Sequence, residues 1–341
     1  MHQVQENPKG VSLVICTYNG AGRIKETLSH ILRQDVGEEI PWEVIVVDNG
    51  SADDTARVAA ISWQSRIPFR VVSELKRGIT NARACGIMHA SFEYISFIDD
   101  DNWIAPGWVG EVYKTFSENP STGMCGGMNT AVFEVPPPSW FGAVQSCYAI
   151  GKQGEKTSDI TDARGFLWGA GMSLRRSLYL KIRAAGFDYH TRGRVGTRLS
   201  AGDDAELSLA FVAAGYRLWY CEKLMLEHYM PAGRLTWTYA KGLFRGLGES
   251  EYLLDLYRMF IRKTNFPFLK ICCGQVSYAI LYFGWRMATV FKNHENNPRY
   301  LSYLARKYYI ITVLRNACNY RRWMNEIRNY CLDSSQIIKI D

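Results

Sequence analysis

The sequence predicts an α/β fold, in which helices flank a mostly parallel sheet and a helical C-terminal region follows. Over the first hundred residues, apolar runs typical of buried strands alternate with helical patterns. The connections between them are short, as right-handed strand–helix–strand units require. The chain has 341 residues and is 47% hydrophobic, which is enough for a sizeable core and excludes global disorder.

Four strands are predicted in the first hundred residues, each from a short apolar run rich in β-branched residues. They cover residues 11–17, 42–48, 69–73 and 94–99. The first, "VSLVICT", is apolar almost throughout, which indicates a strand buried on both faces.

Three helices are predicted between these strands, over residues 20–34, 51–62 and 78–91. The first carries one apolar stripe, made of Ile24, Leu28, Ile31 and Leu32. The second opens with Ser51 followed by acidic residues, a pattern typical of a helix start.

The middle of the chain, residues 121–235, is less regular. Residues 135–140, "VPPPSW", predict a proline-stiffened loop, and residues 165–179 predict a strand leading into a helix. Residues 202–221 predict a helix and then a strand after Gly215.

The last part of the chain is aromatic, basic and helical in pattern. From residue 256 onward there are 14 Lys and Arg against 4 Asp and Glu, a net charge of +10, which leaves −3 for the rest of the +7 total. We therefore divide the chain into a domain over residues 1–235 and a helical region over residues 236–341. Such a basic region suits an anionic partner, for example a membrane surface.

One apolar stretch in this region, residues 271–285, is bracketed by basic residues. Its length is below the about 20 residues that span a bilayer, so it predicts a buried or interfacial helix. A core helix of a C-terminal subdomain is the equal alternative.

Nine cysteines occur, none in a C-x-x-C pair. We expect reduced thiols, no signal peptide, and a cytoplasmic protein that contacts the inner face of the membrane peripherally if the basic region binds lipid. Cys16, Cys85 and Cys125 lie in apolar surroundings and predict small core residues, whereas Cys272 and Cys273 could in principle bind metal or carry a lipid.

Polar residues follow the predicted strands where each one ends. Asp48 and Asn49 follow the second, and the fourth runs into the acidic triplet Asp99, Asp100 and Asp101. Because ligands of such sheets bind beyond the carboxyl ends of the strands, these residues predict a site at one edge. Neighbouring like charges destabilise one another, so the triplet is either a solvated turn or faces positive charge.

Six motifs, in order, carry a resemblance to a known family: "VSLVICTYNG", "VIVVDNGSADDT", "RGITNARACGI", "FIDDDN", "GAGMSLRRS" and "GDDAEL". Over residues 11–235 the chain resembles the nucleotide-sugar-dependent glycosyltransferases of family 2, which have the GT-A fold. This resemblance implies roles for particular residues at the edge of the sheet.

The resemblance makes Asp99 and Asp101 a D-x-D pair, with Asp100 between them. Asp101 would bind Mn²⁺ or Mg²⁺ directly and Asp99 would face the ribose of the nucleotide, while His228 would be a further metal ligand or a charge partner for phosphate. Arg234 would reach the diphosphate. The alternatives are a solvated acidic turn and a structural histidine.

By the same resemblance, Asp48 would accept a hydrogen bond from the base, although a turn or cap for the next helix is the alternative. Thr17, Tyr18 and Asn19 match the loop after the first strand, where Tyr18 either stacks on the base or packs beneath the loop. Arg83 would bind phosphate or hold a carboxylate of the site, unless it is a surface arginine.

In the resemblance, Asp204 would be the base that takes the proton of the acceptor hydroxyl, with Asp203 preceding it. Helix capping is the alternative role for both carboxylates. Trp168 and Gly169 would form the wall beside the donor sugar, and Trp168 and Trp140 could stack on sugar faces or belong to the core.

These residues predict a metal-dependent, inverting glycosyltransferase that moves a sugar from a nucleoside diphosphate, UDP being favoured, to a hydroxyl of a glycan or lipid-linked acceptor in cell-surface polysaccharide synthesis. Nucleic acid is not an expected partner. The Gln-x-x-Arg-Trp motif of processive synthases is absent from the sequence, which favours single additions. The alternatives are a sugar nucleotidyltransferase of similar fold and a non-catalytic carbohydrate-binding relative.

Overall fold

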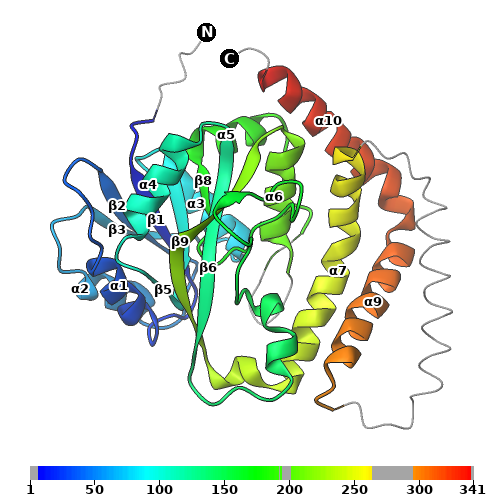
Figure 1. Ribbon diagram of the computed structural model, residues 1–341, viewed down its shortest axis with the longest axis horizontal. Helices are drawn as coiled ribbons and strands as arrows, with labels where there is room; N and C mark the ends of the chain where they lie inside the picture. Colours follow the sequence, from blue (N-terminus) through cyan, green and yellow to red (C-terminus); the bar gives the residue numbers. More distant parts are fainter. Residues whose placement is uncertain (1–6, 192, 194–200, 263–294, 339–341) are drawn as a thin grey trace.

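The computed structural model confirms the α/β fold and describes residues 7–191, 193, 201–262 and 295–338. Helices flank one nine-stranded mixed sheet (Figure 1), with the strand order β3-β2-β1-β4-β8-β6-β9-β5 and β7 paired with β9. The apolar stretch at 271–285, with Cys272 and Cys273, lies outside the described residues.

The first half of the sheet agrees with the predicted strands. The strands are β1 (Val11–Thr17), β2 (Trp42–Asp48), β3 (Phe69–Ser73) and β4 (Tyr94–Asp99). All three pairings among them are parallel. Every residue of β1 is buried because helices cover both faces of the sheet there.

The helices between these strands are α1 (Ile24–Leu32), α2 (Thr55–Ser62) and α3 (Ile79–His89). All are shorter than predicted. The predicted start of α2 was wrong: the Ser51 hydroxyl accepts a hydrogen bond from the Asn19 backbone N–H at 2.9 Å instead of capping a helix. Long-range loop contact therefore overrides the local capping pattern.

The second half of the sheet is mixed. Its strands are β5 (Asn102–Ile104), β6 (Thr122–Phe133), β7 (Ser158–Asp159), β8 (Ser173–Arg175) and β9 (Arg217–Met230). Its helices are α4 (Trp108–Glu118), α5 (Arg176–Ala184) and α6 (Asp203–Ala213), with short 3₁₀ turns at Phe141–Ala143, Gln145–Tyr148 and Ala232–Leu235.

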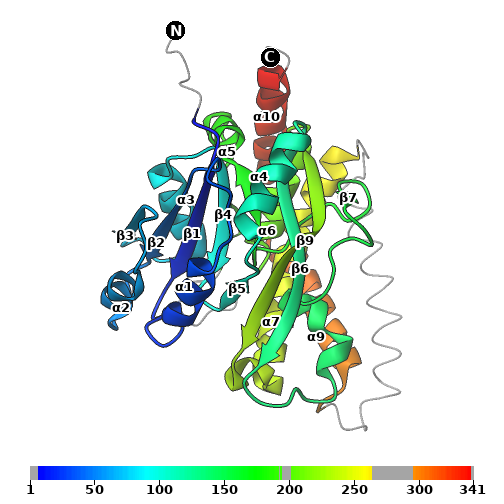
Figure 2. The same cartoon turned by 60° about the vertical axis from the view of Figure 1, so that its left-hand side comes forward.

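The expectation of an irregular middle was wrong for β6, which runs parallel to β9 as one of the two longest strands (Figure 2). Glycines interrupt its apolar pattern. A Cβ on Gly127 would lie 1.7 Å from the carbonyl oxygen of Leu224 in β9. The close approach of these two strands therefore requires glycine at position 127. The sequence pattern alone carries no trace of that approach.

The C-terminal region is helical, as predicted. Within the described residues its elements are α7 (Trp237–Ile261), α9 (Pro298–Arg315), a 3₁₀ turn at Ala317–Asn319 and α10 (Tyr320–Ile338). Helix α7 packs against α6 and α9, and α10 packs against α7 and α5 (Figure 1). One hydrophobic cluster joins sheet residues to α7, α9 and α10. The division at residue 235 stays a prediction.

The cysteine predictions are partly confirmed, since Cys16 and Cys125 are buried and Cys85 is only half-buried. Burial raises the pKa of the Cys16 and Cys125 thiols well above the usual range. Within the described residues, none of the helices combines the length and apolar character that a membrane span requires.

Candidate active site

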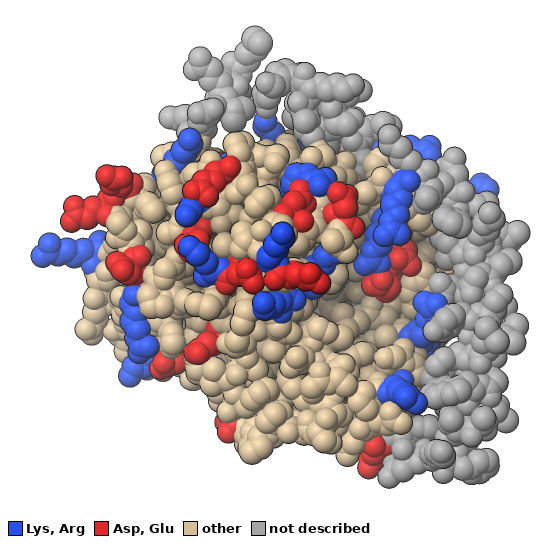
Figure 3. Space-filling view, in the orientation of Figure 1, with Lys and Arg blue, Asp and Glu red and all other residues tan. Residues whose placement is uncertain are grey.

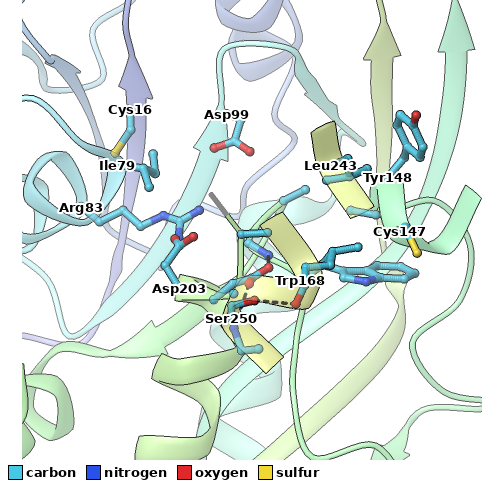
Figure 4. Close-up of a pocket in the computed structure, with 18 of the residues that line it drawn as sticks. Cys16, Ile79, Arg83, Asp99, Cys147, Tyr148, Trp168, Asp203, Leu243 and Ser250 are labelled. Atoms are coloured by element: carbon cyan, nitrogen blue, oxygen red, sulfur yellow. Dashed lines mark hydrogen bonds and ion pairs between the residues drawn. The ribbon is translucent and has the colours of Figure 1, made fainter. Parts of the chain in front are cut away.

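A cavity of about 720 Å³ opens beyond the carboxyl ends of β1 and β4. Figure 4 shows Cys16, Ile79 and Arg83 on one side of it, which we call the α3 side. Trp168 and Leu243 lie across from them, on what we call the α7 side. Segments that lie far apart in the sequence therefore meet around one space.

The acidic triplet lines this cavity, and two of its three carboxylates pair with arginines. Asp100 is buried and forms a two-pronged pair with Arg23, at 3.0 Å from Nε and 2.9 Å from Nη2. The Thr17 hydroxyl donates to the same carboxylate at 2.6 Å. Burial raises the pKa of Asp100, and the Arg23 and Thr17 contacts oppose that rise. A solvated turn is therefore wrong for this residue.

Asp101 is also buried and lies against two basic side chains. Arg234 Nη2 is 2.6 Å from its carboxylate, and His228 Nε2 is 3.6 Å away. Arg234 Nη1 also donates to His228 Nε2 at 3.0 Å. His228 lies within β9, paired with Asn102 of β5, because this strand runs well past residue 221, where the predicted strand ends. One guanidinium thus contacts both predicted metal ligands.

Asp99, half-buried, points into the cavity at the end of β4 (Figure 4). It lies between the two sides of the cavity, where a ligand spanning them would pass. Two carboxylates of the triplet are thus paired with arginines, and Asp99 lines the cavity between its two sides.

Arg83 and Asp203 form a buried ion pair at 2.8 Å that joins α3 to the start of α6 (Figure 4). Their side chains are only 7% and 10% exposed, so the alternative of a surface arginine is wrong. A Cβ on Gly169 would lie 2.6 Å from Arg83 Nη2. A side chain at position 169 would therefore have to displace the end of the Arg83 side chain, which the ion pair with Asp203 holds in place.

Asp204 lies in the first turn of α6 and lines the cavity. Its two carboxylate oxygens accept hydrogen bonds from the backbone N–H groups of Gly169 and Ala205, each at 2.8 Å. Burial and the charge of Asp203 raise the pKa of Asp204, and Arg83 opposes this. A fixed carboxylate with a raised pKa suits a general base.

Of the loop residues predicted to bind the nucleotide, Thr17 and Tyr18 line the cavity. The guanidinium of Arg77 lies 5.0 Å above the Tyr18 ring. The Thr17 hydroxyl is occupied with Asp100. A nucleotide base that stacked on this face of the Tyr18 ring would therefore have to displace the Arg77 guanidinium.

Asn19 and Asp48 are not among the residues that line the cavity. The Asn19 side chain accepts from the Ala52 backbone N–H at 2.8 Å. Asp48 accepts from the Ser51 backbone N–H at 3.1 Å, which is the turn role given as its alternative. The Asn19 contact ties the loops after β1 and β2 together, and the predicted base contact of Asp48 stays a prediction.

The two tryptophans differ. Trp168 lines the cavity beneath the guanidinium of Arg164, which lies 4.5 Å from the ring. Trp140 is 3% exposed and packs against Phe141 and Trp237, so it belongs to the core.

Sequence reasoning missed Arg23 as the partner of Asp100, Arg77 and Arg164 in the lining, and the whole contribution of α7. Helix α7 adds Leu243, Leu247 and Leu254 to the α7 side. The charge of Arg23, four residues after Asn19, is visible in the sequence, but nothing in the sequence indicates that Asp100 is its partner. The apolar residues of α7 look like ordinary core positions in the sequence.

A parallel half-sheet with a strand-end acidic triplet, a carboxylate of raised pKa and several arginines around one cavity defines a transferase of the GT-A type. Charged side chains of both signs are also intermixed across the face drawn in Figure 3. The family model for "Glycosyl transferase family 2" matches residues 12–183, and the chain belongs to that family.

Named relatives match parts of the chain. Poly-β-1,6-N-acetyl-D-glucosamine synthase of Staphylococcus epidermidis is 31% identical over 116 residues, which cover 34% of this chain and 27% of that protein. The glucosyl-dolichyl phosphate glucuronosyltransferase of Haloferax volcanii is 23% identical over 255 residues, covering 72% and 77%. The chain thus spans about a quarter of the synthase's length.

A third relative is the UDP-Glc:α-D-GlcNAc-diphosphoundecaprenol β-1,3-glucosyltransferase WfgD of Escherichia coli, 33% identical over 96 residues that cover 28% of this chain and 36% of that protein. Among solved structures, S. aureus TarS residues 1–349 in complex with UDP has a TM-score of 0.49 at 17% identity, covering 97% of this chain and 92% of that one.

Proposed function

We propose that this chain transfers a sugar from a nucleoside diphosphate, with UDP favoured, to a hydroxyl of a glycan or lipid-linked acceptor, with inversion and with the help of a divalent cation. The observation that carries the proposal is the meeting of Asp99, Asp101, His228 and Asp204 around one cavity. Family membership favours this function over that of a nucleotidyltransferase of similar fold.

The donor would bind on the α3 side, beyond the ends of β1 and β4, where ligands of such sheets bind. Arg77 lines that region and supplies positive charge for a diphosphate, whereas the charges of Arg23 and Arg234 are shared with Asp100 and Asp101. The name of WfgD specifies UDP-glucose, which supports a uridine donor for this chain.

The residues at Asp101 would fit a divalent cation if the Arg234 guanidinium, which here contacts both Asp101 and His228, gave way to it. Its carboxylate and the His228 imidazole converge, with 3.6 Å between Oδ1 and Nε2. Mg²⁺ at nucleotides typically has one or two protein carboxylates, with phosphate oxygens and water as its other ligands. Across the described residues, no group of three or more His, Cys, Asp or Glu side chains suited to a metal is found. When bound, the cation would neutralise charge on the leaving diphosphate.

Asp204 would take the proton of the acceptor hydroxyl as that oxygen attacks the anomeric carbon. The bond from that carbon to the diphosphate oxygen breaks, and the nucleoside diphosphate leaves with the electron pair. Attack from the face opposite the leaving group inverts the configuration. The N–H groups of Gly169 and Ala205 hold both oxygens of the base in place.

We place the acceptor on the α7 side, where the leucines of α7 offer an apolar wall, and we assign Trp168 to this acceptor wall instead of to the donor sugar, beside which the sequence predicted it. Two relatives are named for lipid-linked acceptors, one a dolichyl phosphate and one a diphosphoundecaprenol. Relatives named for polysaccharide synthesis support a role at the cell surface.

We also propose that the basic C-terminal region contacts the inner face of a membrane. Its net charge of +10, from residue 256 onward, motivates this. Co-sedimentation with vesicles of anionic lipid should weaken steadily as salt is raised, because exposed charges are screened. Binding that ignores salt, or no binding at all, would exclude an electrostatic contact.

The decisive test is calorimetric titration of UDP with and without Mn²⁺. Wild-type protein should bind UDP more tightly with Mn²⁺, and Asp101→Ala should lose that increment, an expected weakening of more than about tenfold. Asp162→Ala is the matched control, since this carboxylate is 87% exposed and lies outside the cavity lining. No binding of UDP, GDP or dTDP under any condition would reject the proposed donor.

A further inference from the structure

Six arginines line the cavity, and the described structure gives four of them a carboxylate partner. These pairs are Arg23 with Asp100, Arg83 with Asp203, Arg234 with Asp101, and Arg258 with Glu251 and Asp255. The remaining two are Arg77 and Arg164. Arg77 is exposed on the α3 side, where water can solvate its charge.

Arg164 is half-buried, and no carboxylate of the described residues lies within ion-pair distance of it. Its guanidinium lies over two rings, 4.4 Å from that of Phe166 and 4.5 Å from that of Trp168, and its Nε donates to the Phe166 carbonyl oxygen at 3.1 Å. Burial lowers its pKa, and the charge of Asp204 opposes this only in part. The protein thus holds a partly desolvated cation in a fixed position at the cavity.

Its location assigns it to the acceptor rather than the donor. The guanidinium of Arg164 lies over the ring of Trp168, and Trp168 lies across the cavity from Ile79 and Arg83 (Figure 4). The base Asp204 accepts from Gly169, the residue next to Trp168, and its charge acts on Arg164, so Arg164 lies near the base. A group held by Arg164 would therefore be attached to the molecule whose hydroxyl reaches Asp204.

We propose that Arg164, held over Phe166 and Trp168, binds an oxyanion carried by the acceptor. This inference rests on the proposed glycosyl transfer and adds that the acceptor is acidic. A phosphate of a lipid-linked or phosphorylated glycan and the carboxylate of a uronic acid share the required chemistry. A planar guanidinium matches either oxyanion with two parallel hydrogen bonds.

The experiment titrates three small acceptor probes into protein saturated with UDP and Mn²⁺: glucose 1-phosphate, methyl glucuronide and the neutral methyl glucoside. Ligand-observed NMR gives each dissociation constant. Wild-type protein should bind at least one acidic probe about tenfold or more tightly than the neutral one. Preference for glucose 1-phosphate indicates a phosphorylated acceptor, and preference for the glucuronide indicates a uronic acid.

Arg164→Met should abolish the preference for the acidic probe and leave the UDP affinity unchanged. Arg164→Lys should keep part of it, because the charge remains while the planar geometry is lost. Arg77→Met is the matched control: this arginine also lies over a ring of the cavity, but on the α3 side, so its loss should weaken UDP and spare the probes. Arg164→Gln replaces Arg164→Met if the methionine variant does not fold.

Equal binding of acidic and neutral probes, or a preference that survives Arg164→Met, would overturn the proposal. So would a loss of UDP or UDP-glucuronate affinity in Arg164→Met with the probes unaffected, since the arginine would then serve the donor. Failure of UDP to bind wild-type protein would reject the proposed donor instead, and the probes would then be titrated without UDP.

Discussion

Replacing Asp204 by asparagine should lower the rate of sugar transfer by about 10²–10⁴-fold, the usual contribution of a positioned general base. Asparagine keeps the size of the side chain and can still accept the N–H of Gly169, but it cannot take a proton. The affinity for UDP should stay unchanged, because Asp204 lies on the acceptor wall. Release of UDP from a UDP-sugar, with calorimetry for binding, measures both.

The pH dependence of the transfer rate is an independent test of Asp204 as the general base. The active form of Asp204 is deprotonated and its pKa is raised above the ordinary 3.8, so activity should fall with falling pH at a higher pH than for an ordinary aspartate. Asp203→Asn removes the neighbouring negative charge and should move this acidic limb to lower pH. Arg83→Met removes a charge that lowers the pKa and should move the limb to higher pH.

Asp162→Asn serves as the control for Asp204→Asn, because it also removes one carboxylate charge but from an exposed position outside the cavity. Its rate should match that of the wild type. A rate for Asp204→Asn within about threefold of the wild type would show that another group takes the proton. An acidic limb of the pH profile that Asp203→Asn and Arg83→Met both leave in place would show the same.

Arg83→Met should have the second large effect, a loss of about 3–5 kcal/mol in the free energy of unfolding. The substitution leaves the Asp203 carboxylate buried without its cation, at a point where α3 and α6 meet. Chemical denaturation followed by circular dichroism measures the change.

The double variant Arg83→Met/Asp203→Leu separates the cost of the orphaned charge from the cost of lost packing. Replacing both members of a buried pair by apolar residues is often close to neutral, so most of the stability should return. If the double variant is as unstable as Arg83→Met, packing around Arg83 rather than charge holds the two helices. A small effect of Arg83→Met alone would mean that water reaches Asp203.

The parallel half of the sheet was predictable because its signals are local. Strands β1 to β4 are continuous apolar runs, and their observed bounds are those predicted. The second half was not, because β6 contains Gly127, and only the nearby carbonyl oxygen of Leu224 explains that glycine. Likewise, Ser51 has the pattern of a helix cap, but contact with Asn19 gives it another role.

The sequence alone determined the α/β class, the order of the first four strands and the acidic residues at their ends. Apolar periodicity and the polar residues at strand ends are local patterns that can be recognised from neighbouring residues. It also led to the family, through six motifs in order. Only the tertiary structure decided which charge faces which: Arg23 on Asp100, Arg234 on Asp101, and Arg164 over the rings of Phe166 and Trp168. These partners lie up to 133 residues apart, as Asp101 and Arg234 do. Electrostatic pairing depends on distance in space, which no local pattern encodes.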